Sequence, residues 1–227
     1  MTILQELATL SEENYKVFNL RIIPTNHNVL GVRIPLLKQI AKRITKESPY
    51  EFLTLDKKNN YEMILLEGLV ISSLKVPFSN LVPYIETYMT KIDNWAQVDS
   101  FVMNFKGIKK EKEHVYNILT HWLNSKEEFT VRTALIILLS YYVEKEYLEN
   151  IFDISNKIKH KGYYVFMGNS WLISVCMAKF PEETIQFLKV NTLDEITHNK
   201  SIQKSCESSR VSKEHKEILK TLKRKSK

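Results

Sequence analysis

Apolar residues recur along most of this chain at the spacing of one helix face. One such set, with members three and four residues apart, consists of Leu36, Leu37, Ile40, Ala41 and Ile44. A helix over these residues is entered at Pro35, which is tolerated in a first turn, and ends at Ser48 before a short helix that runs through Leu55. The stretch from Tyr61 to about Lys75 is apolar nearly all round, which predicts a helix buried on more than one side.

The same reasoning assigns helices to most of the remaining chain. Residues 3–23 carry the apolar positions of one or two helices, and 106–110 are expected to form a loop in which Gly107 caps the preceding helix. Further helices are expected from Pro77 onward and over 94–105, 111–123, 127–144, 147–160, 163–179, 181–188, 194–208 and 212–225. No stretch alternates between apolar and polar residues as a strand with turn signals does.

About a dozen helices joined by short loops, with each pair taking roughly 35–40 residues, are typical of helical repeats. The sequence therefore predicts an all-α fold, a HEAT-like helical-repeat solenoid of roughly six antiparallel helix pairs. Residues 1–227 are expected to form a single domain whose C-terminal helical end, 200–227, is basic. A compact all-α bundle is the alternative.

One short helix, over 94–105, combines a buried face with polar chemistry. Asn94 is a plausible N-cap, and Gln97 three residues later gives a weak capping-box pattern. The apolar side of this helix is expected to consist of Val98, Phe101, Val102 and Phe105. Asp99 lies on the flank of that side beside Trp95, where a carboxylate is costly unless it has a partner or a task. Stabilisation of Asp99 by the helix N-terminus, with Trp95 as ordinary core, is the simpler alternative.

Composition narrows the class of protein. Apolar residues make up 44% of the 227, and the low numbers of glycine (five) and proline (six) favour helices with short connections. The two cysteines, Cys176 and Cys206, have neither metal-ligand spacing nor a disulfide framework, so we expect a reducing, cytoplasmic location. The N-terminus lacks the pattern of a signal peptide, and we expect no membrane span because the longest apolar run, Leu135 to Val143, is too short.

The positive charge of the chain is concentrated at its C-terminal end. The formal net charge is +7, and the segment 200–227 contains ten Lys or Arg and three Asp or Glu, which also gives +7. The first 199 residues are therefore neutral. A basic end suits a polyanion such as nucleic acid, and Lys204 and Arg210 are the candidate contacts within it. A solvated terminal helix that keeps the protein soluble is the alternative.

The sequence lacks the motifs of several kinds of catalytic site. It has no Gly-rich phosphate loop, no HExxH and no CxxC, and its six histidines are scattered, so we expect neither a metal nor a cofactor. The pairs Glu62/Glu67 and Glu127/Glu128 could serve as acid and base, but solvated helix charges are the simpler interpretation.

Two more residues interrupt otherwise apolar helices. Trp171 lies in the helix expected over 163–179, and Arg132 lies beside Val131 and Ala134. A guanidinium in such surroundings needs a carboxylate or a phosphate. Asp99 could be that partner in a structural ion pair, and DNA could be as well.

Four segments of this chain resemble, in order and spacing, those of one family. They are Leu30–Lys38 (LGVRIPLLK), Asn94–Ser100 (NWAQVDS), Thr130–Ala134 (TVRTA) and Tyr163–Trp171 (YYVFMGNSW). The chain is similar over nearly its whole length to the AlkD-like DNA alkylation repair proteins, which are HEAT-like repeat DNA glycosylases. Each motif is short, and their order and spacing together carry the resemblance.

The resemblance implies a role for each candidate residue. Asp99 would be the catalytic carboxylate, Trp95 and Trp171 would pack on the sugar of the damaged nucleotide, and Arg132 would hold a phosphate or orient Asp99. The implied partner is alkylated duplex DNA, from which a monomer without a cofactor would excise purines made cationic by N3 or N7 alkylation. The family is thought not to need a deep pocket for a flipped base.

This chain departs from the family at one position. Glycosylase members usually carry an Arg three residues after the second tryptophan, where Ser174 stands here. The loss of that charge and the neutral first 199 residues leave two alternatives open. One is a non-catalytic helical-repeat module that binds nucleic acid or protein, and the other is a structural scaffold.

Overall fold

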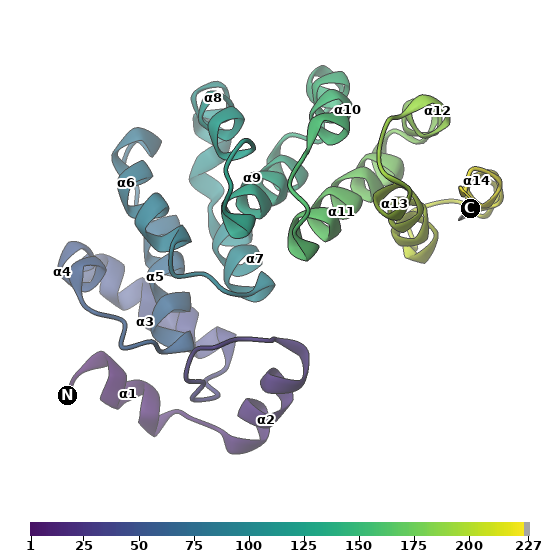
Figure 1. The fold of residues 1–227 in the computed structure, drawn as a ribbon. Helices are drawn as coiled ribbons and strands as arrows, with labels where there is room; N and C mark the ends of the chain where they lie inside the picture. The colour runs from purple at the N-terminus through teal and green to yellow at the C-terminus, as the bar shows by residue number, and fades with distance from the viewer. Residues whose placement is uncertain (225–227) are drawn as a thin grey trace. The chain divides into compact units, whose positions relative to one another are not determined.

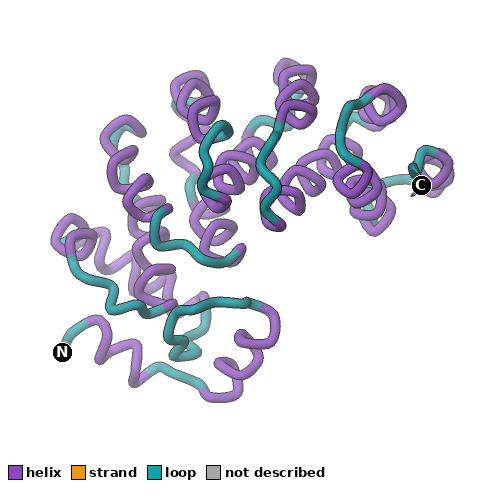
Figure 2. The backbone as a smooth tube through the Cα atoms, in the orientation of Figure 1, coloured by secondary structure: helices purple, strands orange, loops and turns teal. Residues whose placement is uncertain are grey.

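The computed structural model describes residues 1–224, which form fourteen α-helices and no β-strand (Figure 1, Figure 2). The helices are α1 (Ile3–Thr9), α2 (Glu13–Ile22), α3 (Ile34–Glu47), α4 (Pro49–Thr54), α5 (Tyr61–Ser73), α6 (Phe78–Met89), α7 (Trp95–Asn104), α8 (Lys112–Trp122), α9 (Glu128–Tyr141), α10 (Leu148–Lys157), α11 (Tyr163–Lys179), α12 (Pro181–Val190), α13 (Glu195–Glu207) and α14 (Lys213–Thr221). Residues 225–227, the last of the predicted basic end, lie outside the described part.

The helices belong to two compact units, one spanning Met1–Tyr116 and the other beginning at Asn117. In the first unit α5 packs against both α3 and α7, and α6 packs on α5. In the second, α11 packs against both α9 and α13, and α10 and α12 pack on α11. Helices two apart in sequence therefore form a row, and the helices between them in sequence pack onto that row. This pattern recurs in each of the two units, and it confirms the predicted all-α helical-repeat fold. That residues 1–227 make a single domain stays a prediction.

The burial of α5 follows from its place in its row. Every residue from Tyr61 to Ser72 is buried, as the apolar character of this stretch predicted. A helix with neighbours on several sides has no face left for solvent, and it needs apolar residues all round. The helix begins where the Asn60 side chain accepts a hydrogen bond from the Met63 N–H at 2.9 Å.

The glutamates of α5 are not solvated, and the simpler interpretation of Glu62 and Glu67 was wrong. Glu62 is 0% exposed, and its carboxylate accepts hydrogen bonds from the backbone N–H groups of Leu30, Gly31 and Val32 at 2.7–3.3 Å. The loop that leads into α3 is thus held on α5 by one buried charge, which its backbone donors satisfy.

Glu67 is also buried and lies in an ion-pair cluster. Its carboxylate is 2.7 Å from Lys91 Nζ and 3.8 Å from Lys57 Nζ. The Lys57 ammonium in turn donates to the carbonyls of Phe52 and Leu55, next to the end of α4. Burial lowers the pKa of Lys57, and the negative charge of Glu67 opposes that shift. Glu62 and Glu67 are both buried, so they do not form an acid and base pair on the surface.

The end of α7 differs from the prediction. The helix ends at Asn104 with Phe105 as its C-cap, and Lys106–Lys110 forms a short 3-10 helix in place of the expected loop. Gly107 lies inside that turn and does not cap α7. The Phe105 side chain is buried and stacks on Phe78 at 5.5 Å between ring centroids, so the chain stays packed beyond the end of the helix.

Candidate nucleic-acid interface

The first turn of α7 is fixed by hydrogen bonds. The Asn94 side chain accepts from the N–H groups of Ala96 and Gln97, both at 3.1 Å, which confirms the predicted N-cap. The Gln97 side chain accepts from the N–H of Asp93 at 3.2 Å, one residue before the N-cap, so the capping box expected here is displaced by one position.

Asp93, which sequence analysis missed, joins α7 to a distant loop. Its carboxylate accepts hydrogen bonds from the Thr25 hydroxyl at 2.8 Å and from the Asn26 N–H at 2.6 Å. The Asn94 side-chain amide donates to it at 2.8 Å, and His27 Nε2 is 3.4 Å away. The position directly before an N-cap is the only signal that the sequence offered for this role.

Trp95 and Asp99 lie one turn apart on α7, and both are half-buried. The indole Nε1–H of Trp95 donates to the carbonyl of Ile22, the last residue of α2, at 3.2 Å. The predicted apolar side of α7 is buried and consists of Val98, Phe101, Val102 and Phe105. Trp95 and Asp99 therefore flank a packed face, as predicted, and they lie at the boundary between core and solvent.

In the second unit, α9 holds the first turn of α11 through two charged side chains. The Glu128 carboxylate accepts from the N–H of Tyr164, and the Arg132 guanidinium donates to the carbonyl of the same residue at 3.1 Å. Glu128 lies so close to Gly162 that a Cβ there would be 2.5 Å from its carboxyl group. The interpretation of Glu128 as a solvated charge was therefore wrong.

Arg132 is buried, at 4% exposure. Its Cζ is 5.9 Å from the centre of the Tyr164 ring, and a Cβ on Gly168 would be 3.7 Å from its Nη1. The guanidinium thus lies along α11, where a carbonyl and an aromatic ring contact it. A carboxylate or a phosphate as a further partner of Arg132, as the sequence suggested, stays a prediction.

Trp171 is half-buried on the same helix α11. Ser174 is 6% exposed, and its hydroxyl donates to the Trp171 carbonyl at 2.8 Å. This serine, at the position where the resemblance implies an arginine, is thus satisfied within its own helix and presents no group to a ligand.

The two candidates of the basic end lie on different elements. Lys204 is half-buried on α13, and Arg210 is exposed in the turn before α14, where its N–H bonds to the Ser208 hydroxyl at 3.2 Å. Arg224 has a structural role, since its guanidinium donates to the carbonyl and the side chain of Asn191, both at 2.9 Å. Part of the basic end is therefore packed within the second unit, against the segment around Asn191.

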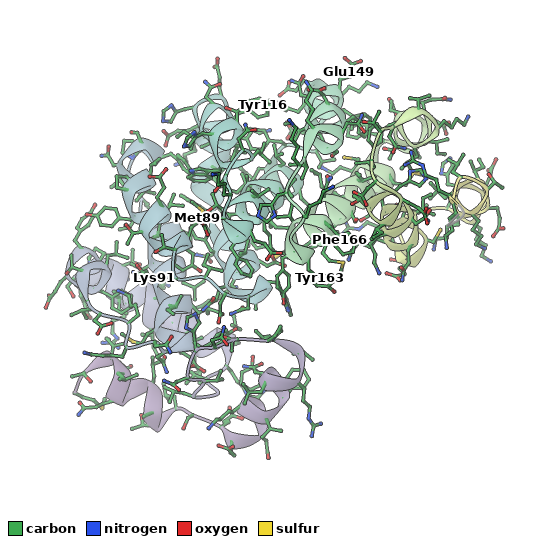
Figure 3. All side chains as sticks on the ribbon, viewed as in Figure 1. Met89, Lys91, Tyr116, Glu149, Tyr163 and Phe166 are labelled. Atoms are coloured by element: carbon green, nitrogen blue, oxygen red, sulfur yellow. The ribbon has the colours of Figure 1, made fainter. Side chains whose placement is uncertain are left out.

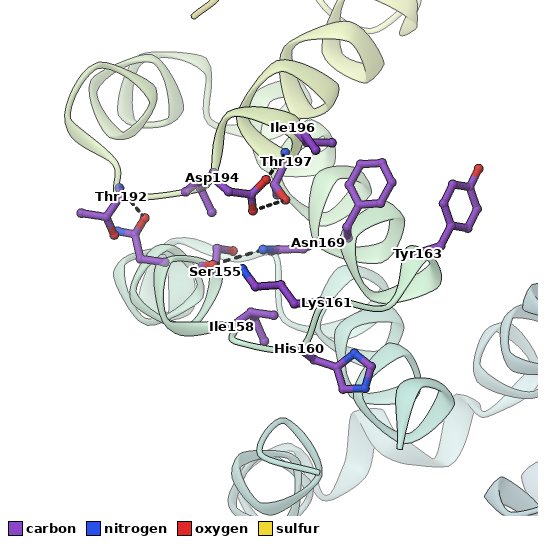
Figure 4. A pocket seen from close by; sticks show the side chains of 13 residues that line it. Ser155, Ile158, His160, Lys161, Tyr163, Asn169, Thr192, Asp194, Ile196 and Thr197 are labelled. Carbon is purple, nitrogen blue, oxygen red and sulfur yellow. Dashed lines mark hydrogen bonds between the residues drawn. The ribbon is translucent and has the colours of Figure 1, made fainter. Parts of the chain in front are cut away.

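A cavity of about 620 Å³ opens between the loop before α11 and the start of α13 (Figure 4). Tyr163 and Phe166, labelled on α11 in Figure 3, line it together with Lys161. Burial raises the pKa of Asp194 in its wall, but hydrogen bonds from Thr197 and the charge of Lys161 outweigh burial and lower it below its ordinary value. Neither Arg132 nor Trp171 lines this cavity.

No group of three or more His, Cys, Asp or Glu side chains in residues 1–224 is arranged to hold a metal ion. In the same part of the chain, no helix has both the length and the apolar character needed to cross a membrane.

The comparison with protein families agrees with the resemblance. No curated protein matches the sequence. The family model described as "DNA alkylation repair enzyme" matches residues 3–208, a range that includes Trp95, Asp99, Arg132 and Trp171. Because this match covers nearly the whole chain, the protein belongs to the family of DNA alkylation repair enzymes.

Proposed function

We propose that this protein is a DNA glycosylase that binds alkylated duplex DNA and releases cationic N3- or N7-alkylated purines. The observation that carries the proposal is the placement of Asp99 and Trp95, half-buried on a helix whose first turn is fixed by Asn94 and Asp93. A carboxylate held at the edge of the core, with an aromatic ring one turn before it, can act on a cation without a pocket that engulfs the base.

The chemistry needs little from the protein because the alkylated base already carries a positive charge. When the bond between the base and C1′ of the sugar breaks, its electron pair goes to the base, which leaves as a neutral purine. Positive charge develops on the sugar, and the Asp99 carboxylate stabilises it electrostatically. A water molecule then adds to C1′ through its oxygen and gives up one proton to the surrounding solvent, which leaves a hydroxyl group on the sugar. The face of Trp95, packed on the sugar, favours the same cationic state.

The second unit supplies contacts to the DNA in this proposal. Trp171 packs against the damaged nucleotide, and Lys204 and Arg210 contact phosphates. Arg132, which is bound to the Tyr164 carbonyl, acts mainly by holding the start of α11 in place. The protein works as a monomer, and the formal net charge of +7 favours association with the polyanion.

The test is release of 7-methylguanine or 3-methyladenine from methylated duplex DNA, followed by chromatography of the free base. We expect wild-type protein to release base and Asp99→Asn to reduce release at least 100-fold, since removal of one preorganised electrostatic group costs about 10²–10³ in rate. Asp153→Asn, an exposed aspartate on α10, is the matched control and should retain full activity. Full activity of Asp99→Asn removes Asp99 from its proposed role.

A second candidate function, a non-catalytic DNA-binding module, is favoured by Ser174. This residue is buried and bonded to its own helix, so α11 lacks the cation found at this position in the family's glycosylases. Such a module would bind duplex DNA with an affinity that falls with salt, and it would release no base. Measurement of binding and release on the same methylated duplex separates the two functions.

A further inference from the structure

Helix α2 exposes most of its apolar side chains and buries a polar one, unlike the other helices of the first unit. Its one buried residue is the polar Asn19, at 5% exposure. Four apolar side chains are instead exposed by 42–53%: Val17, Phe18, Leu20 and Ile22. Exposed apolar residues this dense on one short helix are typical of an interaction surface.

The helix is anchored at both ends. The guanidinium of Arg33 makes two hydrogen bonds with the Glu12 carboxylate, at 2.7 and 2.8 Å, and the Glu12 N–H donates to the Gly31 carbonyl at 3.0 Å. At the other end, the Ile22 carbonyl accepts from the Trp95 indole at 3.2 Å. The apolar face of α2 is therefore held in place, and it adjoins the tryptophan of the candidate site.

The chemistry of this face suits a polyanion that also has apolar surfaces. At about 100° per residue, Asn14, Val17, Phe18, Arg21 and Ile22 lie within an arc of about 140°. No carboxylate lies within that arc, and Arg21 is exposed in it. Glu12, which directly precedes the helix, is neutralised by Arg33.

The Phe18 side chain packs on the ring of Tyr15, which in turn contacts the guanidinium of Arg33. Its ring stacks on that of Tyr15, with 6.3 Å between centroids, and the Cζ of Arg33 is 4.9 Å from the centre of the Tyr15 ring. An aromatic side chain supported in this way loses little conformational entropy when it contacts a flat partner.

We infer that α2 is an apolar wedge that contacts the base stack of duplex DNA from the minor groove, with Phe18 and Ile22 as its tip. This inference rests on the proposed function, because it places the wedge beside Trp95. Apolar side chains that insert at a base step partly unstack it and kink the duplex. A wedge next to the damaged nucleotide would weaken its stacking before the Asp99 carboxylate acts.

The experiment compares wild type with the double variant Phe18→Ser/Ile22→Ser and with Val190→Ser, an exposed apolar control on α12. Affinity for an undamaged duplex is measured at several salt concentrations, and 2-aminopurine in the duplex reports unstacking by its fluorescence. We expect the double variant to bind at least 10-fold more weakly, to lose the fluorescence increase and to keep the salt slope of wild type, because apolar contacts release no counterions.

Arg21→Gln provides a second variant that does not touch the apolar residues. It should weaken binding and reduce the salt slope by about one, which is the signature of one lost phosphate contact. Thermal unfolding of each variant checks that the fold is kept.

Three results would overturn the wedge: wild-type affinity and fluorescence in the double variant, equal loss in Val190→Ser, or a wild-type dimer that Phe18→Ser/Ile22→Ser converts to a monomer. The last result assigns α2 to a second copy of the chain. If methylated DNA loses no base while the variants still bind less tightly, the glycosylase proposal falls and the wedge stands. If base is released and the variants bind as tightly as wild type, the glycosylase proposal stands and the wedge falls.

Discussion

The substitution Glu62→Gln tests whether one buried charge holds the first unit together. The Glu62 carboxylate is fully buried on α5 and accepts the backbone N–H groups of Leu30, Gly31 and Val32. Glutamine has the same shape but lacks the charge, and it places an NH₂ group where one carboxylate oxygen accepted a donor. The substitution therefore changes the hydrogen bonds without opening a cavity.

The expected loss follows from the number of bonds. A hydrogen bond to a charged group contributes about 1.5–3 kcal/mol and a neutral one about 0.5–1.5 kcal/mol. Three bonds that each lose about 1 kcal/mol give a loss of about 3 kcal/mol in the free energy of unfolding. With a urea slope of about 1–3 kcal/mol per molar, the unfolding midpoint should fall by about 1–3 M.

Urea unfolding is followed by the fluorescence of Trp95, which is in the first unit, and by far-ultraviolet circular dichroism for the whole chain. A tryptophan-to-phenylalanine background at Trp122 and Trp171 isolates the first-unit signal. Glu51→Gln, at an exposed position on α4, is the control and should change stability by less than about 0.5 kcal/mol. If Glu62→Gln behaves like this control, Glu62 does not anchor the loop.

Three further predictions concern other parts of the chain. Burial lowers the pKa of His198 below its ordinary 6.5, so the folded state binds its proton less readily than the unfolded chain. The contribution of His198 to stability should therefore be full above about pH 6.5 and fall as the pH drops below it, and the melting temperature of His198→Gln between pH 8 and 5.5 should depend less on pH than that of wild type. Ser174→Arg should tighten duplex binding and steepen the salt slope by about one, as titrations by fluorescence anisotropy would detect; an unchanged slope means that the new side chain meets no phosphate. Gly31 has a φ of +90°, and an added Cβ would be 2.6 Å from the Glu12 carbonyl oxygen, so Gly31→Ala should destabilise the first unit by more than about 1 kcal/mol in the same urea assay, whereas an unchanged midpoint would show that the loop has room to adjust.

Local rules explain what could be predicted from the sequence. Asn94 was recognisable as an N-cap because capping depends on a residue and its next three neighbours. The buried side of α7 was recognisable because helical periodicity determines which residues share a face. The order of the helices followed from the same two kinds of signal, and both operate within about one or two helical turns.

Contacts between distant segments explain what could not be predicted. Glu62 has the sequence context of a solvated helix charge, and only the loop at Leu30, some thirty residues earlier, makes it a buried acceptor. Glu128 likewise becomes a cap for α11 through Tyr164, thirty-six residues later. In α2 the spacing of Phe18 and Ile22 is that of a normal buried face, and the exposure of both was visible only in the structure.

The same distinction explains how the candidate site is positioned. The W-x-x-x-D segment places Trp95 and Asp99 on one face of α7, but it does not determine where that helix lies. The position of its first turn depends on Asp93, which is bonded to Thr25 and Asn26, and on the bond from the Trp95 indole to Ile22. These contacts span 67–73 residues of sequence and involve polar groups that periodicity does not detect. A substitution in the loop around Thr25 should therefore affect the proposed base release at Asp99 as much as one in α7 itself, because the geometry of a preorganised carboxylate depends on what holds its helix.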